Sequence, residues 1–558
     1  MSNRTSCPLA GADTTLLQRM NVPRTPADER CGTVPRMVRM SAAEFGASEA
    51  VVDGEQRLSY RDVENEMLDI ARSLVARGVS RGDRVAIWAP NSITWITTAL
   101  GVLATGAWLV PLNTRFKGQE AAYILDKARV RTLFVANGFL GNDYLGWLAN
   151  VKPELCALED TVLLPLPGER STASWEAFRD QRDGASATMV DALIDAGSPD
   201  DVCDVIFTSG TTGTPKGVML RHGASLRGYE LFGARFELGR GDRYVIPTPF
   251  FHCFGYKAGW MVSLMSGAIA YPLAVFDPGS LLQLIERERI THLPGPPTLF
   301  TALCDHPQRT SRDLASLRCA MIGAASIPPI VIERMRAELG FEHVLVGYGL
   351  TETHALVCLT DASDPPQLVA TTVGRPLPET ELRIVDDGDH DVAAGTNGEI
   401  VVRTPYRMSG YLDDEEATAK TIVDGWVHTG DVGFVDDDGY VHITDRKKDM
   451  FIVGGFNVAP AEVERAILGF EGVAQVAVVG MPDDHLGEVG AAFVVLHDGA
   501  DVTAEDVIAH SRQRLANYKV PRNVQILDAL PLNATGKVLK TVLREMLAAE
   551  VPSTRGAT

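Results

Sequence analysis

The sequence contains no C-x-x-C pair, and its eight cysteines do not gather with histidines at the spacing of a zinc site. Scattered cysteines indicate reduced thiols and therefore a cytoplasmic protein. The N-terminus lacks the unbroken apolar core of a signal peptide, and the first forty residues read as a loose extension. Basic residues are in deficit, 52 against 72 acidic ones, which leaves a net charge of −20. This charge repels phosphate backbones and anionic lipid, so nucleic-acid and membrane-surface partners are disfavoured.

One stretch lacks charge altogether. No charged residue occurs between Arg84 and Arg115, which is longer than the roughly 20 residues needed to cross a bilayer. Its turn-forming residues divide it instead into a predicted strand at 85–89, a turn, a helix at 92–104 and a second strand at 107–112. Apolar residues on both faces are typical of parallel strands covered by helices, so we expect a buried β-α-β unit and no integral membrane segment.

The length of 558 residues predicts three or four core-sized units, at roughly 100 to 200 residues each. Helical signals alternate with short apolar runs through most of the chain, the pattern of a layered α/β fold. From about residue 370 short strands and Gly/Asp turns predict a β-rich subdomain. After the charged joint at 445–449, the pattern predicts a compact α+β domain. The predicted boundaries are an N-terminal extension at 1–40, a main domain at 41–447, a C-terminal domain at 448–545 and a tail at 546–558.

The strongest local signal is the string TSGTTGTPKGV, which starts directly after the apolar strand ending at Phe207. Glycines let backbone amides approach an anion, hydroxyls add donors and a lysine adds a point charge, so this composition suits a polyphosphate. The spacing is not that of a Walker A loop. A flexible Gly/Thr loop is the alternative for an isolated GTTG. The predicted phosphate-binding residues are Thr208, Ser209, Gly210, Thr211, Thr212, Gly213 and Lys216.

The full string resembles the phosphate loop of the adenylate-forming superfamily, which includes acyl-CoA synthetases, 4-coumarate ligases, luciferases and peptide-synthetase adenylation domains. Other motifs occur in the matching order, and the similarity runs from about residue 50 to residue 545. The resemblance implies a multidomain α/β protein. Its large N-terminal region would hold two α/β subdomains and a β-barrel-like subdomain, followed by a small mobile α+β C-terminal domain.

A second motif, GYGLTET, spans residues 347–353. An aromatic ring can stack on a purine, a hydroxyl can donate to a phosphate oxygen, and a carboxylate can hold Mg²⁺. By resemblance, Tyr348 and Gly349 meet the adenine of ATP, Thr351 meets the α-phosphate, and Glu352 binds Mg²⁺.

Three shorter signals complete the expected nucleotide site. Gly323, Ala324 and Ala325 resemble the small-residue wall of the adenine pocket, although tight packing after a strand explains them equally well. Asp431, in Thr-Gly-Asp, resembles the acceptor for the ribose hydroxyls, and Arg446 resembles the second ribose contact. A turn-forming aspartate is the alternative for Asp431.

Near the C-terminus, Lys537 sits in the string PLNATGK. A lone surface lysine is usually only solvated charge, but the matching lysine of the family acts in adenylate formation. Within the joint, Lys448 matches the family's hinge, a known mode of domain switching. After rotation, Gly454, Gly455 and Phe456 would replace Lys537 and border the CoA tunnel, although a hairpin turn also explains these glycines.

Phe251-His252 bears on the acid substrate. Amino-acid-activating relatives tend to carry Phe-Asp here, so an amino acid is disfavoured. By resemblance, His252 lines the junction of acyl group and thiol, with a packed aromatic-cluster histidine as the alternative. The strings FFHCFGYK and AVFDP resemble an actinobacterial fatty-acid-CoA ligase subgroup that includes enzymes acting on the propanoate arm of partly degraded steroid rings.

We therefore expect a ligase that uses ATP, Mg²⁺ and CoA to convert an apolar carboxylic acid, a fatty acid or a steroid-ring propanoate, to its CoA thioester. The expected catalytic residues are Lys537, Thr351, Glu352 and His252. No carrier-protein signature follows Lys537, which favours free CoA as the acceptor. Two alternatives stay open: a ligase that loads an acyl carrier protein, and a catalytically silent nucleotide sensor. The sequence leaves the oligomeric state open.

Overall fold

The structure is a computed structural model, and the chain divides into two compact units. The first comprises residues 1–323, 327–381 and 402–427, and the second comprises 324–326, 382–401 and 428–558. Only the backbone is described at 446, 456, 457 and 550. The structure describes residues 25–151, 155–208, 215–323, 327, 329–446, 449–453, 456–483, 486–515, 517–533 and 537–550.

The expected loose extension is wrong for residues 27–40. Helix α2 (Ala27–Cys31) and helix α3 (Val34–Phe45) form there. The Thr33 hydroxyl caps α3 by accepting from Arg36 N, and Val34 is fully buried in the core of the first unit. Because apolar positions recur at helical spacing on α3, this segment is part of the folded core.

One mainly parallel sheet of the first unit runs in the order β18-β8-β7-β4-β3-β5-β6. Its strands, in that order, are Gly410–Tyr411, Lys216–Arg221, Val202–Thr208, Trp108–Pro111, Arg84–Trp88, Val130–Val135 and Asp160–Leu163. The charge-free stretch forms β3, helix α5 (Ile93–Ala104) and β4, with β3 and β4 parallel, as predicted. Among the helices of the described residues, none is long and apolar enough to cross a membrane.

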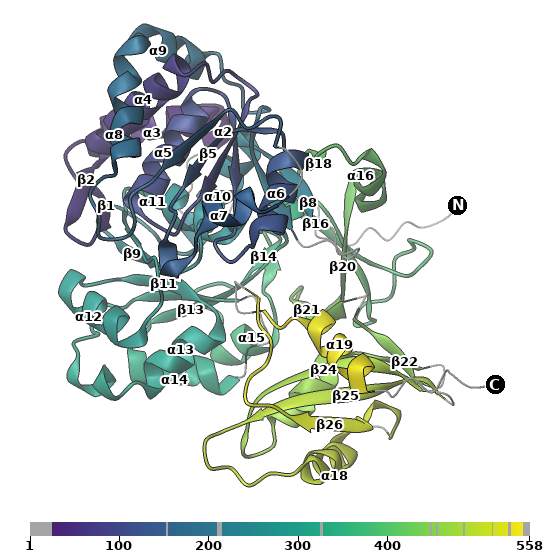
Figure 1. The fold of residues 1–558 in the computed structure, drawn as a ribbon. Coiled ribbons are helices and arrows are strands. Elements are labelled where there is room, and N and C mark those ends of the chain that lie inside the picture. Colours follow the sequence, from purple (N-terminus) through teal and green to yellow (C-terminus); the bar gives the residue numbers. More distant parts are fainter. Residues whose placement is uncertain are drawn as a thin grey trace. The chain divides into compact units, whose positions relative to one another are not determined.

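The second sheet of this unit runs in the order β15-β14-β13-β12-β11-β9-β10-β1-β2. Its strands, in that order, are Arg375–Pro376, Cys358–Leu359, His343–Tyr348, Cys319–Ile322, His292–Gly295, Arg243–Ile246, Ile269–Pro272, Glu49–Asp53 and Gln56–Ser59. Helices α12 (Pro278–Glu288), α13 (Pro297–Asp305) and α14 (Pro329–Leu339) lie side by side on one face (Figure 1). Successive residues of β9 point to opposite faces of the sheet. Val245 packs with these helices, and Tyr244 faces the opposite core.

That opposite core lies between the two sheets and is shared by several buried helices. The Ser59 side chain begins α4 with a capping box, as its position predicted. The helices that contribute to this core are α4 (Tyr60–Ala76), α5, α10 (His222–Arg235), the π-helix η3 (Phe254–Met261) and α11 (Val262–Ser266). The remaining helices of the unit are α6 (Gly118–Lys127), α7 (Tyr144–Ala149), α8 (Ala173–Arg179), α9 (Ala187–Asp195), α15 (Pro366–Thr371) and α16 (Glu415–Thr421).

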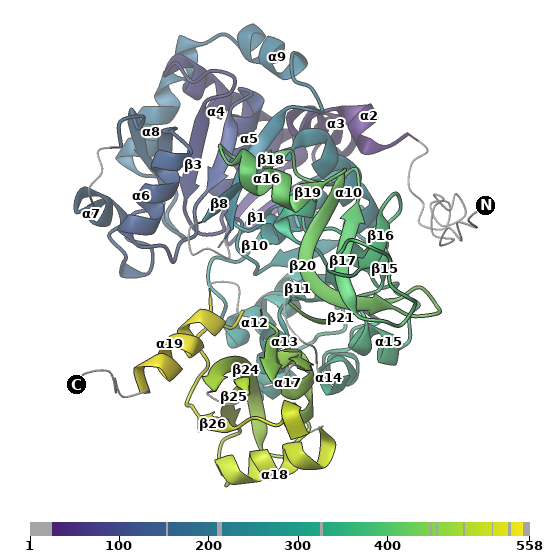
Figure 2. The same ribbon diagram turned by 90° about the vertical axis from the view of Figure 1, so that its right-hand side faces the viewer.

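A curled antiparallel sheet follows, in the order β16-β17-β20-β19 with β21 paired to β20 (Figure 2). Its strands, in that order, are Glu381–Val385, Gly398–Arg403, Trp426–Val435, Ile422–Val423 and Val441–Arg446. The division between the compact units passes through β16, β17 and β20. This sheet is the predicted β-rich subdomain.

The remainder of the second unit is the predicted α+β domain, with its own apolar core. Its sheet runs in the order β23-β22-β25-β24, with β26 paired to β25. The strands, in that order, are Phe456–Val458, Phe451–Val453, Gly487–Leu496, Val473–Asp483 and Asn523–Ile526. Its helices are α17 (Pro460–Leu468), α18 (Ala504–Arg514) and α19 (Lys540–Glu550).

Candidate active site

The predicted phosphate loop connects two antiparallel strands. Thr208 is the last residue of β7 and pairs with Lys216, the first residue of β8. The loop residues Ser209, Gly210, Thr211, Thr212 and Gly213 lie outside the described residues. Thr208 and Lys216 are therefore cross-strand neighbours at the base of the loop.

The other nucleotide motifs of this unit lie where neighbouring parallel strands end. Gly323 follows β12, and β13 ends at Tyr348. A Cβ atom at Gly323 would lie 3.4 Å from the carbonyl oxygen of Gly347, so the two motifs are neighbours. Ligands of open α/β sheets bind outside the carboxyl ends of the strands. Ala324 and Ala325 lie outside the described residues.

The residues after Tyr348 form a strained turn. Thr351 and Glu352 lie in the 3₁₀ turn η5 (Thr351–Thr353). The next two residues, His354 and Ala355, have φ values of 56° and 60°, which non-glycine residues rarely adopt. A Cβ atom at Gly349 would lie 2.1 Å from the carbonyl carbon of Ala355, so only glycine fits there. Backbone strain of this kind persists where the surrounding structure holds a functional residue in place.

Tyr411 links the phosphate-loop motif to the motif that contains Glu352. The sequence analysis did not predict this residue. Its hydroxyl donates to Glu352 Oε1 at 2.7 Å, and the Nζ atom of Lys216 lies 5.0 Å from its ring centroid. Burial and the Glu352 carboxylate raise the pKa of Tyr411, so it stays a donor at neutral pH. The tyrosine is 59 residues from Glu352 and arrives through the pairing of β18 with β8, which no local pattern indicates.

His252 lies two residues before Phe254, where η3 begins. The backbone N–H of Phe254 donates to His252 Nδ1 at 3.3 Å, and the ring is half-buried. Burial lowers the pKa of His252 to about 4, so the ring is neutral at physiological pH. A π-helical segment next to this residue is notable because π-bulges occur frequently at functional sites.

The two predicted ribose contacts lie in the second unit. Asp431 is in β20 and pairs with Arg446 of β21 across the antiparallel register. The turn interpretation of Asp431 is wrong, because the residue lies in the middle of a strand and is only 3% exposed. The sheet thus brings together two residues that are separated by a turn in the sequence.

Lys537 also lies in the second unit, next to Val538, which bridges to Leu532. The predicted turn at 534–536 lies outside the described residues. The N–H of Lys537 donates to Asn533 Oδ1 at 2.8 Å, and its carbonyl oxygen accepts from Asn533 N at 2.7 Å. The residue is exposed. Lys448, Gly454 and Gly455 lie outside the described residues. Phe456 begins β23 and pairs with Val453 of β22, so the strands that flank the glycines are arranged as in a hairpin.

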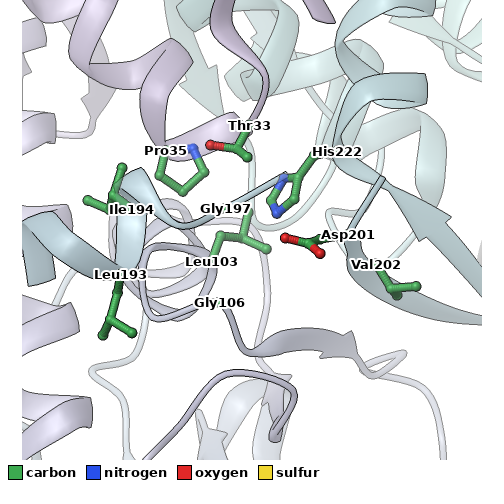
Figure 3. Close-up of a pocket in the computed structure, with 10 residues that line it drawn as sticks. All are labelled: Thr33, Pro35, Leu103, Gly106, Leu193, Ile194, Gly197, Asp201, Val202 and His222. Carbon is green, nitrogen blue, oxygen red and sulfur yellow. The ribbon is translucent and has the colours of Figure 1, made fainter. Parts of the chain in front are cut away.

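Two hollows of the first unit contain none of the predicted site residues. One is a buried cavity of about 10 Å³, where the side chains of Thr33, His222 and Asp201 lie next to one another (Figure 3). Its volume matches about one water molecule, far below that of a nucleotide. The other, of about 420 Å³, is an open hollow beside Lys117 and Trp147.

Comparison with known proteins places this site in a family. The AMP-binding enzyme family matches residues 38–412, and the AMP-binding enzyme C-terminal domain matches residues 462–537. The chain therefore belongs to the AMP-binding enzyme family, the adenylate-forming class that its motifs predicted. It is an acid–thiol ligase that uses ATP and forms acyl-CoA through an acyl-adenylate.

Its relatives span nearly the whole chain. A 3-[(3aS,4S,7aS)-7a-methyl-1,5-dioxo-octahydro-1H-inden-4-yl]propanoyl:CoA ligase of Rhodococcus jostii (strain RHA1) is 47% identical over 93% of this chain and 99% of its own. The ligase of the same name from Mycobacterium tuberculosis is 45% identical over 92% and 99%. The crystal structure of the anthranilate CoA ligase AuaEII with anthranoyl-AMP superimposes with a TM-score of 0.83, at 26% identity, over 93% of this chain and 98% of that one.

Proposed function

We propose that this enzyme converts a fused-ring propanoate, of the kind left by partial degradation of a steroid, to its CoA thioester. The observation that carries the proposal is the 47% identity to a ligase named for such an acid, over almost the whole length of both chains. The Phe251-His252 pair supports a non-amino acid, because His252 is neutral and offers no carboxylate to a substrate ammonium.

In the first half-reaction, a carboxylate oxygen of the acid attacks the α-phosphorus of ATP and pyrophosphate leaves. The acyl carbon thereby gains a good leaving group. Lys216 and Thr208 would hold the phosphates at the base of the loop, and Thr351 would donate to the α-phosphate. Tyr348 would pack on the adenine, beside Gly323. Donors fixed before the reaction stabilise developing charge without reorganisation.

Glu352 is the residue that would hold Mg²⁺. It supplies a carboxylate at the strand ends and is oriented by Tyr411, and Mg²⁺ is commonly bound by one or two carboxylates together with substrate phosphates. A bound magnesium ion neutralises phosphate charge. The donor set of this site therefore fits the ion.

The second half-reaction needs a different set of residues. The thiol sulfur attacks the acyl carbon, its proton is lost to solvent or a base, and AMP leaves. We infer that the C-terminal domain serves both steps by rotating at Lys448. Lys537 would act in the first step, while Gly454, Gly455 and Phe456 would border the CoA channel in the second. Asp431 and Arg446 would hold the ribose in both.

Free CoA is the proposed acceptor, because the two relatives at 47% and 45% identity are both named as CoA ligases. A carrier-loading ligase is the second candidate, and competition between CoA and a phosphopantetheine-bearing carrier would separate the two. The scattered cysteines support a cytoplasmic location. A silent nucleotide sensor is the least supported alternative, since Thr351, Glu352 and Lys537 are all present.

The test is a panel of acids assayed with ATP and CoA. The panel would contain a dioxo-hydrindane propanoate, straight-chain fatty acids of several lengths, and cinnamate-type aryl acids. We expect the ring propanoate to have the highest kcat/KM for AMP and thioester formation. Equal or better use of a straight-chain or aryl acid would reject the proposed substrate. Release of AMP with no thioester after CoA is added would reject the ligase.

A further inference from the structure

A fully buried ion pair lies beneath the site and takes no part in the chemistry described so far. The Nζ atom of Lys257 lies 2.8 Å from Asp204 Oδ2, and both side chains are 0% exposed. Lys257 also donates to Ser225 Oγ at 2.7 Å. Burial alone would lower the pKa of Lys257, but the Asp204 carboxylate outweighs this and raises it, so the lysine is charged.

Such a pair needs an explanation. Removing two charges from water is costly, and buried pairs can often be replaced by apolar side chains without loss of stability. A buried pair is thus weak evidence for stability, whereas fixing one relative position of two elements is an attested use.

The pair joins two elements that lie next to predicted site residues. Asp204 is on β7, the strand that ends at Thr208 and enters the phosphate loop. Lys257 is on η3, five residues after His252, and the N–H of Tyr256 donates to the His252 carbonyl at 3.0 Å. The ion pair between Lys257 and Asp204 therefore connects the segment that contains His252 to the strand that leads into the phosphate loop.

A second link reaches the turn that carries Thr351 and Glu352. Ser225, the third partner in the ion-pair network, lies on α10 together with Tyr229. The Tyr229 hydroxyl donates to the carbonyl oxygen of His354 at 2.6 Å and lies 3.9 Å from the sulfur of Cys253. Helix α10 thus connects the ion pair both to the residue beside His252 and to the strained turn.

We propose that Lys257 is a positioning residue, and that its ion pair with Asp204 sets the place of His252 relative to the phosphate loop during transfer of the acyl group to the thiol. The proposal rests on the proposed function for its kinetic consequence. Its structural consequence, a displaced His252, does not depend on the identity of the substrate.

The main test is the double variant Asp204→Asn/Lys257→Met, which removes both charges together and keeps similar side-chain volumes. Lys257→Met alone would leave an unpaired buried carboxylate and could fail to fold, so the double variant carries the test. We expect its thermal unfolding to stay close to that of the parent. Thiolysis of a supplied acyl-adenylate should fall about 10- to 100-fold, the effect of a small misplacement near a reacting group.

Two readouts separate positioning from a general loss of stability. First, His252→Ala should lower thiolysis in the parent but add little in the double variant, because residues that act as a unit are not additive. Second, the pKa of His252 followed by NMR should rise from about 4 towards 6.5 in the double variant, since its burial is disturbed. The NMR readout needs no acid substrate, so it judges the proposal even if the proposed function fails.

A matched control neutralises an ion pair elsewhere in the same unit. In Glu66→Gln/Arg179→Met, a pair between α4 and α8 is lost, and Arg179 Nη2 lies 3.0 Å from Glu66 Oε1. This control should change neither thiolysis nor the pKa of His252. A folded Asp204→Asn/Lys257→Met enzyme with parental thiolysis, or with an unmoved pKa of His252, would overturn the proposal.

Discussion

Thr351 of the first unit and Lys537 of the second unit are held in opposite ways. In the first unit Thr351 is 9% exposed, Glu352 accepts from a buried tyrosine, and a chain of buried side chains connects the motifs. In the second unit Lys537 is exposed, and two hydrogen bonds join its backbone to Asn533. A buried, rigid setting suits groups that bind the phosphates in both half-reactions. An exposed position suits a lysine that is needed only in the first half-reaction.

The largest effect should come from Lys537→Ala. Adenylate formation should fall about 10²- to 10³-fold, because one preorganised charge is lost where negative charge develops. Thiolysis of supplied acyl-adenylate should be spared. Acid-dependent exchange of ATP and pyrophosphate measures the first step, and thioester formation measures the second.

Lys540→Ala is the matched control for that experiment. It removes a nearby lysine whose Nζ atom lies 2.9 Å from Glu464 in a structural ion pair. It should leave both half-reactions unchanged. Equal damage to the two steps by Lys537→Ala would contradict the division of labour between the units.

The converse effect is expected from Gly455→Leu. A side chain at this position should obstruct the proposed CoA channel and lower thiolysis about 100-fold, while exchange of ATP and pyrophosphate continues. The same two assays report it. A normal CoA step in this variant would remove the glycine loop from the proposed mechanism.

Tyr411→Phe should have a smaller effect within the rigid unit. The substitution keeps the ring near Lys216 but removes the hydrogen bond to Glu352, and a hydrogen bond to a charged group contributes about 1.5–3 kcal/mol. We expect the magnesium concentration for half-maximal exchange to rise at least about 10-fold. Calorimetric titration of ATP with and without magnesium should show the same shift.

The matched control for Tyr411 is Tyr144→Phe, which removes a hydroxyl that donates to Thr114 O at 2.9 Å in the same unit. Its magnesium requirement should be that of the parent. If Tyr411→Phe and Tyr144→Phe behave alike, Tyr411 only supports the fold.

The smallest effect concerns the dependence of stability on pH. Burial lowers the pKa of His222 from 6.5 to about 3, so between pH 6.5 and 5 the unfolded chain takes up a proton that the folded chain does not. The free energy of unfolding should therefore fall by about 2 kcal/mol over this interval because of His222 alone. The difference in melting temperature between the parent and His222→Gln should narrow as the pH falls.

Much of the fold was predictable because its signals are local. The cap at Ser59, the apolar run at 84–115 and the Gly/Asp turns after residue 370 each reflect short-range chemistry, and the structure confirms the elements they predicted. The ordered motifs also identified the family. These signals need no knowledge of how distant segments meet.

Most of the misses are contacts between distant segments. Tyr411 reaches Glu352 through strand pairing, and Lys257 meets Asp204 across a separation that no spacing rule covers. Asp431 was open to a turn interpretation because aspartates crowd the following loop, yet strand pairing decides its conformation. Helix α3 was missed because its apolar spacing follows a polar segment that reads as a tail.

The docking of α2 and α3 bears on how the protein should be truncated. The family match begins at residue 38, but a chain started there would lose the first turn of α3. It would also lose the N–H of Val34 that donates to His222 Nδ1, and the guanidinium of Arg30 that pairs with Glu230. We therefore expect a chain that starts before Ala27 to be more stable than one that starts at residue 38.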